Sequence, residues 1–140
     1  MVAWEWWNNI SLYGVDFTSG LNTASYKYYI DFAANYRIPY IILDGGWSES
    51  PTNVMEPRPE IDLEELVAYG NERNVGLILW SNWNAIDKDM VDVLEQFEKW
   101  GVKGLKVDFM MLANQYMVNF YERTAQACAK HKLLVDFHGV

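Results

Sequence analysis

Two carboxylates stand where short apolar segments of this chain end. Asp108 closes a strand-like run that begins at Gly104, and Asp44 closes a similar run that begins at Tyr40. Because parallel α/β sheets bind ligands at the carboxyl ends of their strands, we predict that both residues have a catalytic or ligand-binding role. A carboxylate that stays ionised suits attack on the anomeric carbon of a sugar, so Asp108 is the candidate nucleophile.

Lys106 lies two residues before Asp108, and residues two apart on a strand face the same side. We expect Lys106 to hold the Asp108 carboxylate ionised. The alternative is that Asp108 is only an ion-pair partner or a helix cap. Asp44 precedes Gly45-Gly46-Trp47, where glycines let a ligand approach the backbone, so we predict that Asp44 binds substrate. Its alternative role is to close a turn with its own side chain.

Aromatic residues and one histidine complete the predicted site. Trp47 and Trp83 are expected to stack on a sugar ring, with packing beneath a loop as the alternative. His138 is expected to contact the ligand at the end of the fifth strand-like run, with Asp136 as a possible supporting group. The chain is 16% aromatic, a surplus that suits carbohydrate binding. Other polar or aromatic residues at strand ends are Glu5, Asn8, Trp80 and Asn82.

The elements that must position these residues follow an alternating pattern. Five apolar strand-like runs alternate with four amphipathic helical stretches, which is typical of parallel βαβ units. Gly45 to Glu60 is predicted to be a long functional loop without regular structure. The strands are expected at Val2–Trp7, Tyr40–Asp44, Gly76–Trp80, Gly104–Phe109 and Leu133–His138. The helices are expected at Thr23–Tyr36 (capped by Asn22 or Thr23), after Asp62, from near Asp87 to Trp100 with Gly101 as its end, and around Met117–Cys128.

This pattern predicts an α/β fold, the first five strands and four helices of a TIM (β/α)8 barrel. A complete barrel takes about 250 residues, and the chain has 140. We therefore interpret residues 1–140 as a partial catalytic domain whose remaining barrel lies elsewhere. The alternative is a closed five-stranded doubly wound domain. It would leave Trp4, Trp6 and Trp7 on an exposed sheet edge, which is an aggregation hazard.

Composition excludes several classes of partner. The formal charge of −8 and the pI near 4.6 argue against nucleic acid, because phosphate binding relies on Lys and Arg. No apolar run approaches the length of about 18 residues that a membrane span requires. The sequence also has no zinc-like ligand spacing, no Gly-rich phosphate loop and no Gly-x-Ser-x-Gly elbow. A neutral, hydroxyl-rich ligand such as an oligosaccharide fits the remaining pattern.

Five segments, in this order along the chain, resemble glycoside hydrolase family 97. The resemblance spans essentially the whole chain. It implies an α-glucosidase or α-galactosidase whose (β/α)8 barrel stands between an N-terminal β-sandwich and a C-terminal β-domain. The segments are Trp4-Glu5-Trp6-Trp7-Asn8, Leu12-Tyr13-Gly14-Val15-Asp16-Phe17, Leu43-Asp44-Gly45-Gly46-Trp47, Trp100 to Met110, and Val135-Asp136-Phe137-His138-Gly139.

The resemblance also implies a mechanism. Retaining members carry an Asp nucleophile that matches Asp108, whereas inverting members place a Glu directly after the histidine of the fifth strand, where this chain has Gly139. Both positions imply a retaining α-galactosidase, in which Lys106, Asp44 and His138 orient substrate and nucleophile. Gly45 departs from the Glu that is usual in the family.

The resemblance places further groups outside this chain. The general acid/base Glu and the glutamates that bind Ca²⁺ fall in segments not included here, so no metal ligand is expected within residues 1–140 and the isolated piece is expected to be inactive. Periplasmic location or secretion is likewise implied. Two alternatives stay open: a retaining α-glucosidase of the same family, and a non-catalytic carbohydrate-binding remnant.

Overall fold

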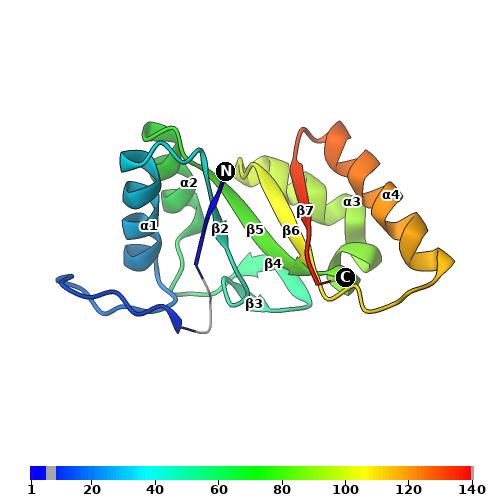
Figure 1. Cartoon of the computed structure of the whole chain (residues 1–140), viewed down its shortest axis with the longest axis horizontal. Coiled ribbons are helices and arrows are strands. Elements are labelled where there is room, and N and C mark those ends of the chain that lie inside the picture. The colour runs from blue at the N-terminus through cyan, green and yellow to red at the C-terminus, as the bar shows by residue number, and fades with distance from the viewer. Residues whose placement is uncertain (6–8, 140) are drawn as a thin grey trace.

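A parallel sheet of five strands forms the centre of the structure (Figure 1), in the order β1-β2-β5-β6-β7. The computed structural model describes residues 1–5 and 9–139. All four strand pairs in this sheet are parallel, which confirms the predicted βαβ pattern. The strands are β1 (Ala3–Trp4), β2 (Tyr40–Leu43), β5 (Gly76–Asn82), β6 (Gly104–Asp108) and β7 (Leu134–Phe137). The part of the first predicted strand that covers Trp6 and Trp7 lies outside the described residues, as does Asn8.

Four helices connect the strands and pack on the sheet. Helix α1 contacts β2, α2 contacts β5, α3 contacts β5 and β6, and α4 contacts β7. Figure 1 shows α1 and α2 beside the β1–β2 edge, and α3 and α4 beside the β6–β7 edge. None of the helices in the described part of the chain has the length and apolarity that a membrane span requires. The helices are α1 (Thr23–Asn35), α2 (Leu63–Glu72), α3 (Trp83–Trp100) and α4 (Gln115–Lys130).

Side-chain caps begin each helix at the residue where the preceding segment ends. Asn22 accepts a hydrogen bond from the backbone N–H of Ser25 at 2.9 Å, which confirms Asn22 as the cap of α1. Asp62 caps α2 through the N–H of Glu65, also at 2.9 Å. Gly101 ends α3 in the left-handed conformation at φ 78°, as its sequence predicts.

Helix α3 begins at Trp83, four residues before the predicted start near Asp87. Asn82 is both the last residue of β5 and the cap of α3, because its side chain accepts from the N–H of Asn84 at 3.3 Å. The helix therefore follows its strand without a loop. A kink at Asp89, where φ −131° and ψ 39° are not helical, lies close to the predicted start near Asp87.

The segment from Gly45 to Glu60 is not the irregular loop that its prolines suggested. It contains an antiparallel hairpin of β3 (Ser48–Ser50) and β4 (Asn53–Pro57), with Ser48 paired to Pro57 and Ser50 to Asn53. The Ser50 hydroxyl accepts a hydrogen bond from the N–H of Asn53 at 3.0 Å, which closes the turn around Pro51 and Thr52. Prolines at a turn and at a strand end are compatible with a hairpin, which explains the wrong prediction.

Candidate functional site

The two faces of the sheet differ in chemistry. Leu43, Leu79 and Val107 belong to the apolar core that includes the helix side chains. Successive side chains of a strand point to opposite faces. Near the carboxyl ends of the strands, the residues that alternate with this core carry polar groups: Asp44, Trp80, Lys106 and Asp108. The strand register places Trp80 of β5 beside Lys106 of β6, and Asn82 beside Asp108. The predicted nucleophile therefore lies at the carboxyl end of β6, on the face opposite the helix-packed core.

Asp108 is buried, and each of its carboxylate oxygens accepts hydrogen bonds. Oδ1 accepts from the backbone N–H of Phe109 at 2.7 Å, while Oδ2 accepts from the indole N–H of Trp80 at 3.0 Å. Phe109 has φ 63°, which a side chain larger than glycine rarely adopts. Local backbone strain of this kind concentrates at functional sites. The Phe109 N–H and the Trp80 indole N–H together fix the orientation of the carboxylate.

These contacts favour the ionised form of Asp108. Burial by itself raises the pKa of the carboxyl group, but hydrogen bonds from Trp80, His138 and the Phe109 N–H, together with the Lys106 charge, lower it below its ordinary value. A carboxylate with a lowered pKa can serve as a nucleophile and cannot serve as a general acid at neutral pH. The geometry therefore agrees with the role that the sequence predicts.

Lys106 bridges the two carboxylates, but it lies closer to Asp44 than to Asp108. Its Nζ is 2.6 Å from Oδ2 of Asp44 and 3.8 Å from Oδ2 of Asp108, and all three side chains are buried. The ammonium also lies 4.0 Å from the ring centre of Trp4, whose indole N–H donates to Asp44. Asp44 additionally accepts from the N–H of Gly45 at 2.7 Å. Both the turn role and the site role predicted for Asp44 are thus compatible with its contacts.

Replacing Lys106 with Met should shift the acid limb of the pH–rate profile. The Lys106 charge lowers the pKa of Asp108, so its loss raises that pKa. Asp108 must be ionised to attack, and activity therefore disappears at a higher pH on acidification. Breaking a buried ion pair also costs about 3–5 kcal/mol of unfolding free energy. The measurements are kcat/KM against pH and chemical unfolding of the full-length protein.

Lys103→Met is the matched control, because Lys103 is exposed and lies three residues before Lys106. It removes the same charge from the same segment and should leave both the acid limb and the stability unchanged. An acid limb in K106M that coincides with that of the wild type would contradict the assigned contact between Lys106 and Asp108.

His138 and Gly139 flank the carboxylate from the end of β7. Nδ1 of His138 lies 3.2 Å from Oδ2 of Asp108, and its ring packs edge-to-face on Trp4 with centroids 5.6 Å apart. The His138 side chain is 51% exposed, so it can reach a ligand as well. Gly139 has φ 74°, and a Cβ added there would meet Oδ1 of Asp108 at 2.4 Å. Any side chain at position 139 would therefore displace this carboxylate.

Trp47 was wrongly predicted as a sugar platform. Its side chain is fully buried in the core, where its indole N–H donates to the backbone oxygen of Trp80 at 2.7 Å and its ring contacts Phe97 and Trp100. Gly46 explains this placement: at φ 98° it turns the chain so that Trp47 points beneath the hairpin. A buried indole with a paired N–H is a packing element.

Trp83 has a packing role, which is close to the alternative predicted for it. It is the first residue of α3, and its half-buried ring packs edge-to-face on Phe120 of α4 at a centroid distance of 5.7 Å. It lies near the strand ends but joins the helix layer. Neither of the two tryptophans predicted to stack on a sugar contacts the carboxylates directly in the described contacts.

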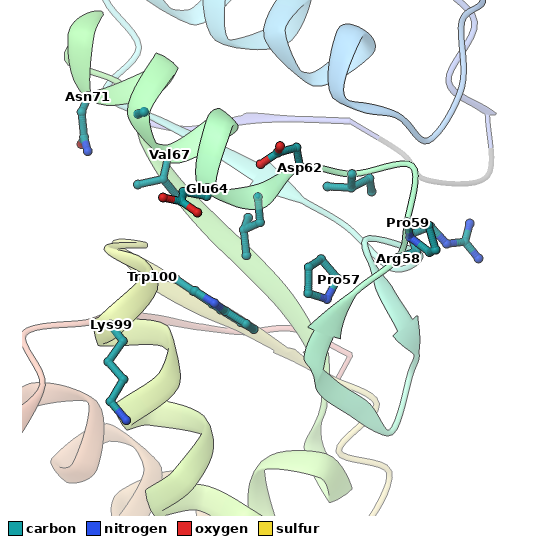
Figure 2. A pocket seen from close by; sticks show the side chains of 12 residues that line it. Pro57, Arg58, Pro59, Asp62, Glu64, Val67, Asn71, Lys99 and Trp100 are labelled. Carbon is teal, nitrogen blue, oxygen red and sulfur yellow. The ribbon is translucent and has the colours of Figure 1, made fainter.

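A groove of about 870 Å³ lies away from the carboxylates, between the hairpin end, α2 and the end of α3. Figure 2 shows the Trp100 ring between the two helices, with Val67 and Pro57 across from it. None of the predicted site residues lines this groove. A hollow of about 390 Å³ lies next to the carboxylates instead, lined in part by Trp80, Asn82 and Phe109.

Sequence reasoning assigned no partner to three contributors to the site. Trp80 and Trp4 donate their indole N–H groups to Asp108 and Asp44, respectively. Glu5 accepts a hydrogen bond from the backbone N–H of Asp44 at 2.9 Å. Trp80 stood at a predicted strand end, two residues before Asn82, so period-two alternation could have placed it on the polar face. Nothing in the sequence pairs Glu5 with Asp44, 39 positions away.

The described residues do not fit a calcium site. Ca²⁺ takes six to eight oxygen ligands, and within residues 1–5 and 9–139 no group of three or more His, Cys, Asp or Glu side chains could hold a metal ion. Asp44 and Asp108 already share the ammonium of Lys106, which repels a cation.

Comparisons with known proteins agree with this geometry. The family model described as Glycoside hydrolase 97 matches residues 4–140. A retaining alpha-galactosidase of Bacteroides thetaiotaomicron is 49% identical over 139 residues, which is 99% of this chain and 21% of the relative. A probable retaining alpha-galactosidase of Streptomyces bingchenggensis is 36% identical over 127 residues, 86% of this chain and 20% of the relative. The chain thus spans about a fifth of the length of these relatives.

Solved structures share the fold. A beta-arabinopyranosidase superposes with a TM-score of 0.76 at 25% identity, covering 99% of this chain and 22% of that protein. A Glycoside Hydrolase Family 97 enzyme from Pseudoalteromonas sp. strain K8, in complex with acarbose, superposes with a TM-score of 0.76 at 24% identity over 98% of this chain and 26% of that protein. The α/β architecture with its parallel sheet is therefore similar to that of Glycoside Hydrolase Family 97 enzymes.

Proposed function

Because the chain belongs to glycoside hydrolase family 97, a family of glycosidases, we propose that it forms part of the catalytic domain of a retaining α-galactosidase. Curated relatives named retaining alpha-galactosidases, 49% and 36% identical, support the substrate. The single observation that carries the mechanism is the buried Asp108 carboxylate, held by donors at the end of β6 with Gly139 against it.

The proposed domain is a (β/α)8 barrel whose first five strands are those of the sheet. Three features support this architecture: the strand order, the parallel pairing of all five strands, and the helices that connect successive strands and pack on the sheet. Because the chain spans about a fifth of its curated relatives, the remaining barrel strands and the flanking β-domains are proposed to come from the rest of a longer protein. The Ca²⁺ ligands and the acid/base Glu are proposed to lie there as well.

In the proposed reaction, an oxygen of Asp108 attacks C1 of a terminal α-galactoside. The C1–O bond to the leaving group breaks, and the acid/base Glu protonates the departing oxygen. Water then attacks C1 of the glycosyl–enzyme ester, gives a proton to the same Glu, and releases galactose with its original anomeric configuration. Retaining enzymes place their two carboxyl groups about 5 Å apart, so the acid/base Glu must approach the open side of Asp108.

The neighbours of Asp108 are proposed to orient the sugar. Lys106 keeps a donor beside both carboxylates, and Asp44 presents a buried acceptor next to it. A paired donor and acceptor suit sugar hydroxyls, which both donate and accept hydrogen bonds. His138 is half exposed and contacts Asp108, so it can bind a hydroxyl while it holds the nucleophile.

A β-arabinopyranosidase is the second candidate, because a protein of that name shares the fold at 25% identity. A β-L-arabinopyranoside has the ring configuration of an α-D-galactopyranoside but lacks the hydroxymethyl group (C6) that galactose carries on C5. The same nucleophile and hydroxyl contacts therefore serve both sugars. The contact to C6 decides between them.

The test is an assay of the full-length protein with nitrophenyl α-galactoside, α-glucoside and β-L-arabinopyranoside. We expect the highest kcat/KM with the galactoside, and proton NMR should detect α-galactose as the first product. Faster cleavage of the arabinopyranoside would favour the second candidate, and faster cleavage of the glucoside would favour an α-glucosidase. Initial release of the β-anomer would contradict retention, and no cleavage of any substrate would indicate a non-catalytic remnant.

A further inference from the structure

A third carboxyl group lies directly behind the proposed sugar site. Glu5 follows β1, is only 4% exposed, and carries both of its hydrogen bonds on Oε1. That oxygen accepts from the backbone N–H of Asp44 at 2.9 Å and from the hydroxyl of Tyr26, on α1, at 3.1 Å. Within the described residues, Oε2 is buried and has no hydrogen-bond partner. Glu5 thus links β1, the end of β2 and α1 through one side chain.

Such a placement is unfavourable for a group that only packs. Burying a charged or unpaired polar group costs free energy that an apolar side chain of similar size would not. A Glu at this position is explained if its acceptor has a function that an apolar residue lacks. Among the described residues, the one backbone N–H that Glu5 binds belongs to Asp44, whose carboxylate contacts Lys106 at 2.6 Å.

We propose that Glu5 is a positioning residue, whose buried carboxyl group holds the backbone N–H of Asp44 and thereby aims the Asp44 carboxylate at Lys106 and the bound sugar. This inference rests on the proposed function of Asp44 as a sugar ligand. Glu5 itself lies behind the turn that begins at Asp44 and acts through it. The role therefore concerns sugar binding and leaves the bond-breaking step to Asp108.

The protonation state of Glu5 makes the contact between Asp44 and Lys106 depend on pH. Burial, and to a smaller extent the Asp44 carboxylate, raises the pKa of Glu5, while the hydrogen bonds from the Asp44 N–H and Tyr26 and the Lys106 charge lower it, and the resulting pKa is about 7. The titratable and charged groups that face Glu5 are Asp44 directly after β2, Lys106 from β6, and Tyr26 and Tyr29 from α1. Below pH 7 a neutral Glu5 leaves Lys106 to Asp44. Above pH 7 an ionised Glu5 competes for Lys106.

Glu5→Gln and Glu5→Ala in the full-length protein separate positioning from packing. E5Q keeps an acceptor for the Asp44 N–H and removes the charge, so it should retain the wild-type KM for nitrophenyl α-galactoside at pH 5.5. It should also lack the rise in KM that we expect of the wild type above pH 7. E5A removes the acceptor and should raise KM about 10- to 100-fold with a smaller change in kcat, because it weakens binding.

Tyr26→Phe and Thr124→Val complete the set. Y26F removes a donor that lowers the pKa of Glu5, so the rise in KM should move to higher pH. Thr124 is fully buried on α4, and its hydroxyl has no partner among the described residues. T124V is therefore a matched buried substitution that should leave KM and its pH dependence unchanged.

A readout without turnover tests the contact directly. In protein labelled with ¹⁵N-aspartate, the amide resonance of Asp44 should shift with a midpoint near pH 7 in the wild type and stay constant in E5Q. An Asp44 amide that does not titrate, or an E5A variant with wild-type KM, would overturn the proposal. An equal rise in KM in E5Q and E5A would also overturn the proposal. If the wild type cleaves no α-galactoside, the proposed function fails, whereas the amide titration still decides whether Glu5 holds Asp44.

Discussion

Asp108→Ala in the full-length protein should lower kcat for nitrophenyl α-galactoside by at least about 10⁴-fold, the scale of losing a catalytic nucleophile. The carboxylate is buried, held by the Trp80 and Phe109 N–H groups, and has a lowered pKa. Its removal leaves a space below C1 of the bound sugar. Azide should enter this space, form a bond to C1 as the nitrophenolate departs, and yield a β-galactosyl azide. Product analysis by NMR measures both rescue and configuration.

The controls for Asp108→Ala address folding. Asp92→Ala makes the same truncation at an exposed site on α3 and should leave kcat unchanged. Circular dichroism of D108A should match the wild type, because the small side chain leaves the neighbouring strands in place. Wild-type turnover in D108A would reject Asp108 as the nucleophile. An α-configured azide product would reject the direction of attack.

Gly139→Ala should lower kcat by about 10²-fold, because a displacement of about 1 Å in a reacting group has effects of this size. A Cβ at this position would lie 2.4 Å from Oδ1 of Asp108 and 3.2 Å from the Phe109 nitrogen. The carboxylate must move, and it then loses the N–H that holds it. We expect the loss in kcat with little change in KM, measured by steady-state kinetics.

Gly14→Ala separates the clash from backbone strain. Gly14 has φ 70°, close to the 74° of Gly139, but a Cβ added there meets nothing within 4 Å. Both variants bear a similar conformational penalty of about 1–2 kcal/mol, and only G139A touches the nucleophile. Equal activities of G139A and G14A would show that Gly139 serves the backbone alone. The contact with Asp108 gives a steric reason why a side chain at position 139 and a carboxylate at 108 exclude one another.

The sequence allowed the positions of the strands and the carboxylates to be predicted, because both follow from local pattern. Asp44 and Asp108 end short apolar runs, and period-two alternation placed Lys106 on the same face as Asp108. Helix ends at Asn22, Asp62 and Gly101 followed from capping chemistry, which is also local. The fold class was predictable for the same reason.

What could not be predicted depends on contacts between distant residues. Lys106 lies closer to Asp44, which is 62 positions away in the sequence, than to Asp108. Trp47 resembled a pocket residue because it follows two glycines, yet the positive φ of Gly46 sends it into the core. Glu5 gained a role only when the fold brought it to the backbone of Asp44. Contacts of this kind join residues far apart in the sequence, so they become visible only when the strands are placed side by side.

Covalent trapping tests the central claim most directly. The full-length protein is incubated with a fluorinated α-galactosyl fluoride, which forms the glycosyl–enzyme ester faster than water hydrolyses it, then digested and analysed by tandem mass spectrometry. We expect one labelled peptide, with the sugar on Asp108, and no label in the D108A variant. A label on another carboxylate, or hydrolysis with inversion and no label at all, would contradict it.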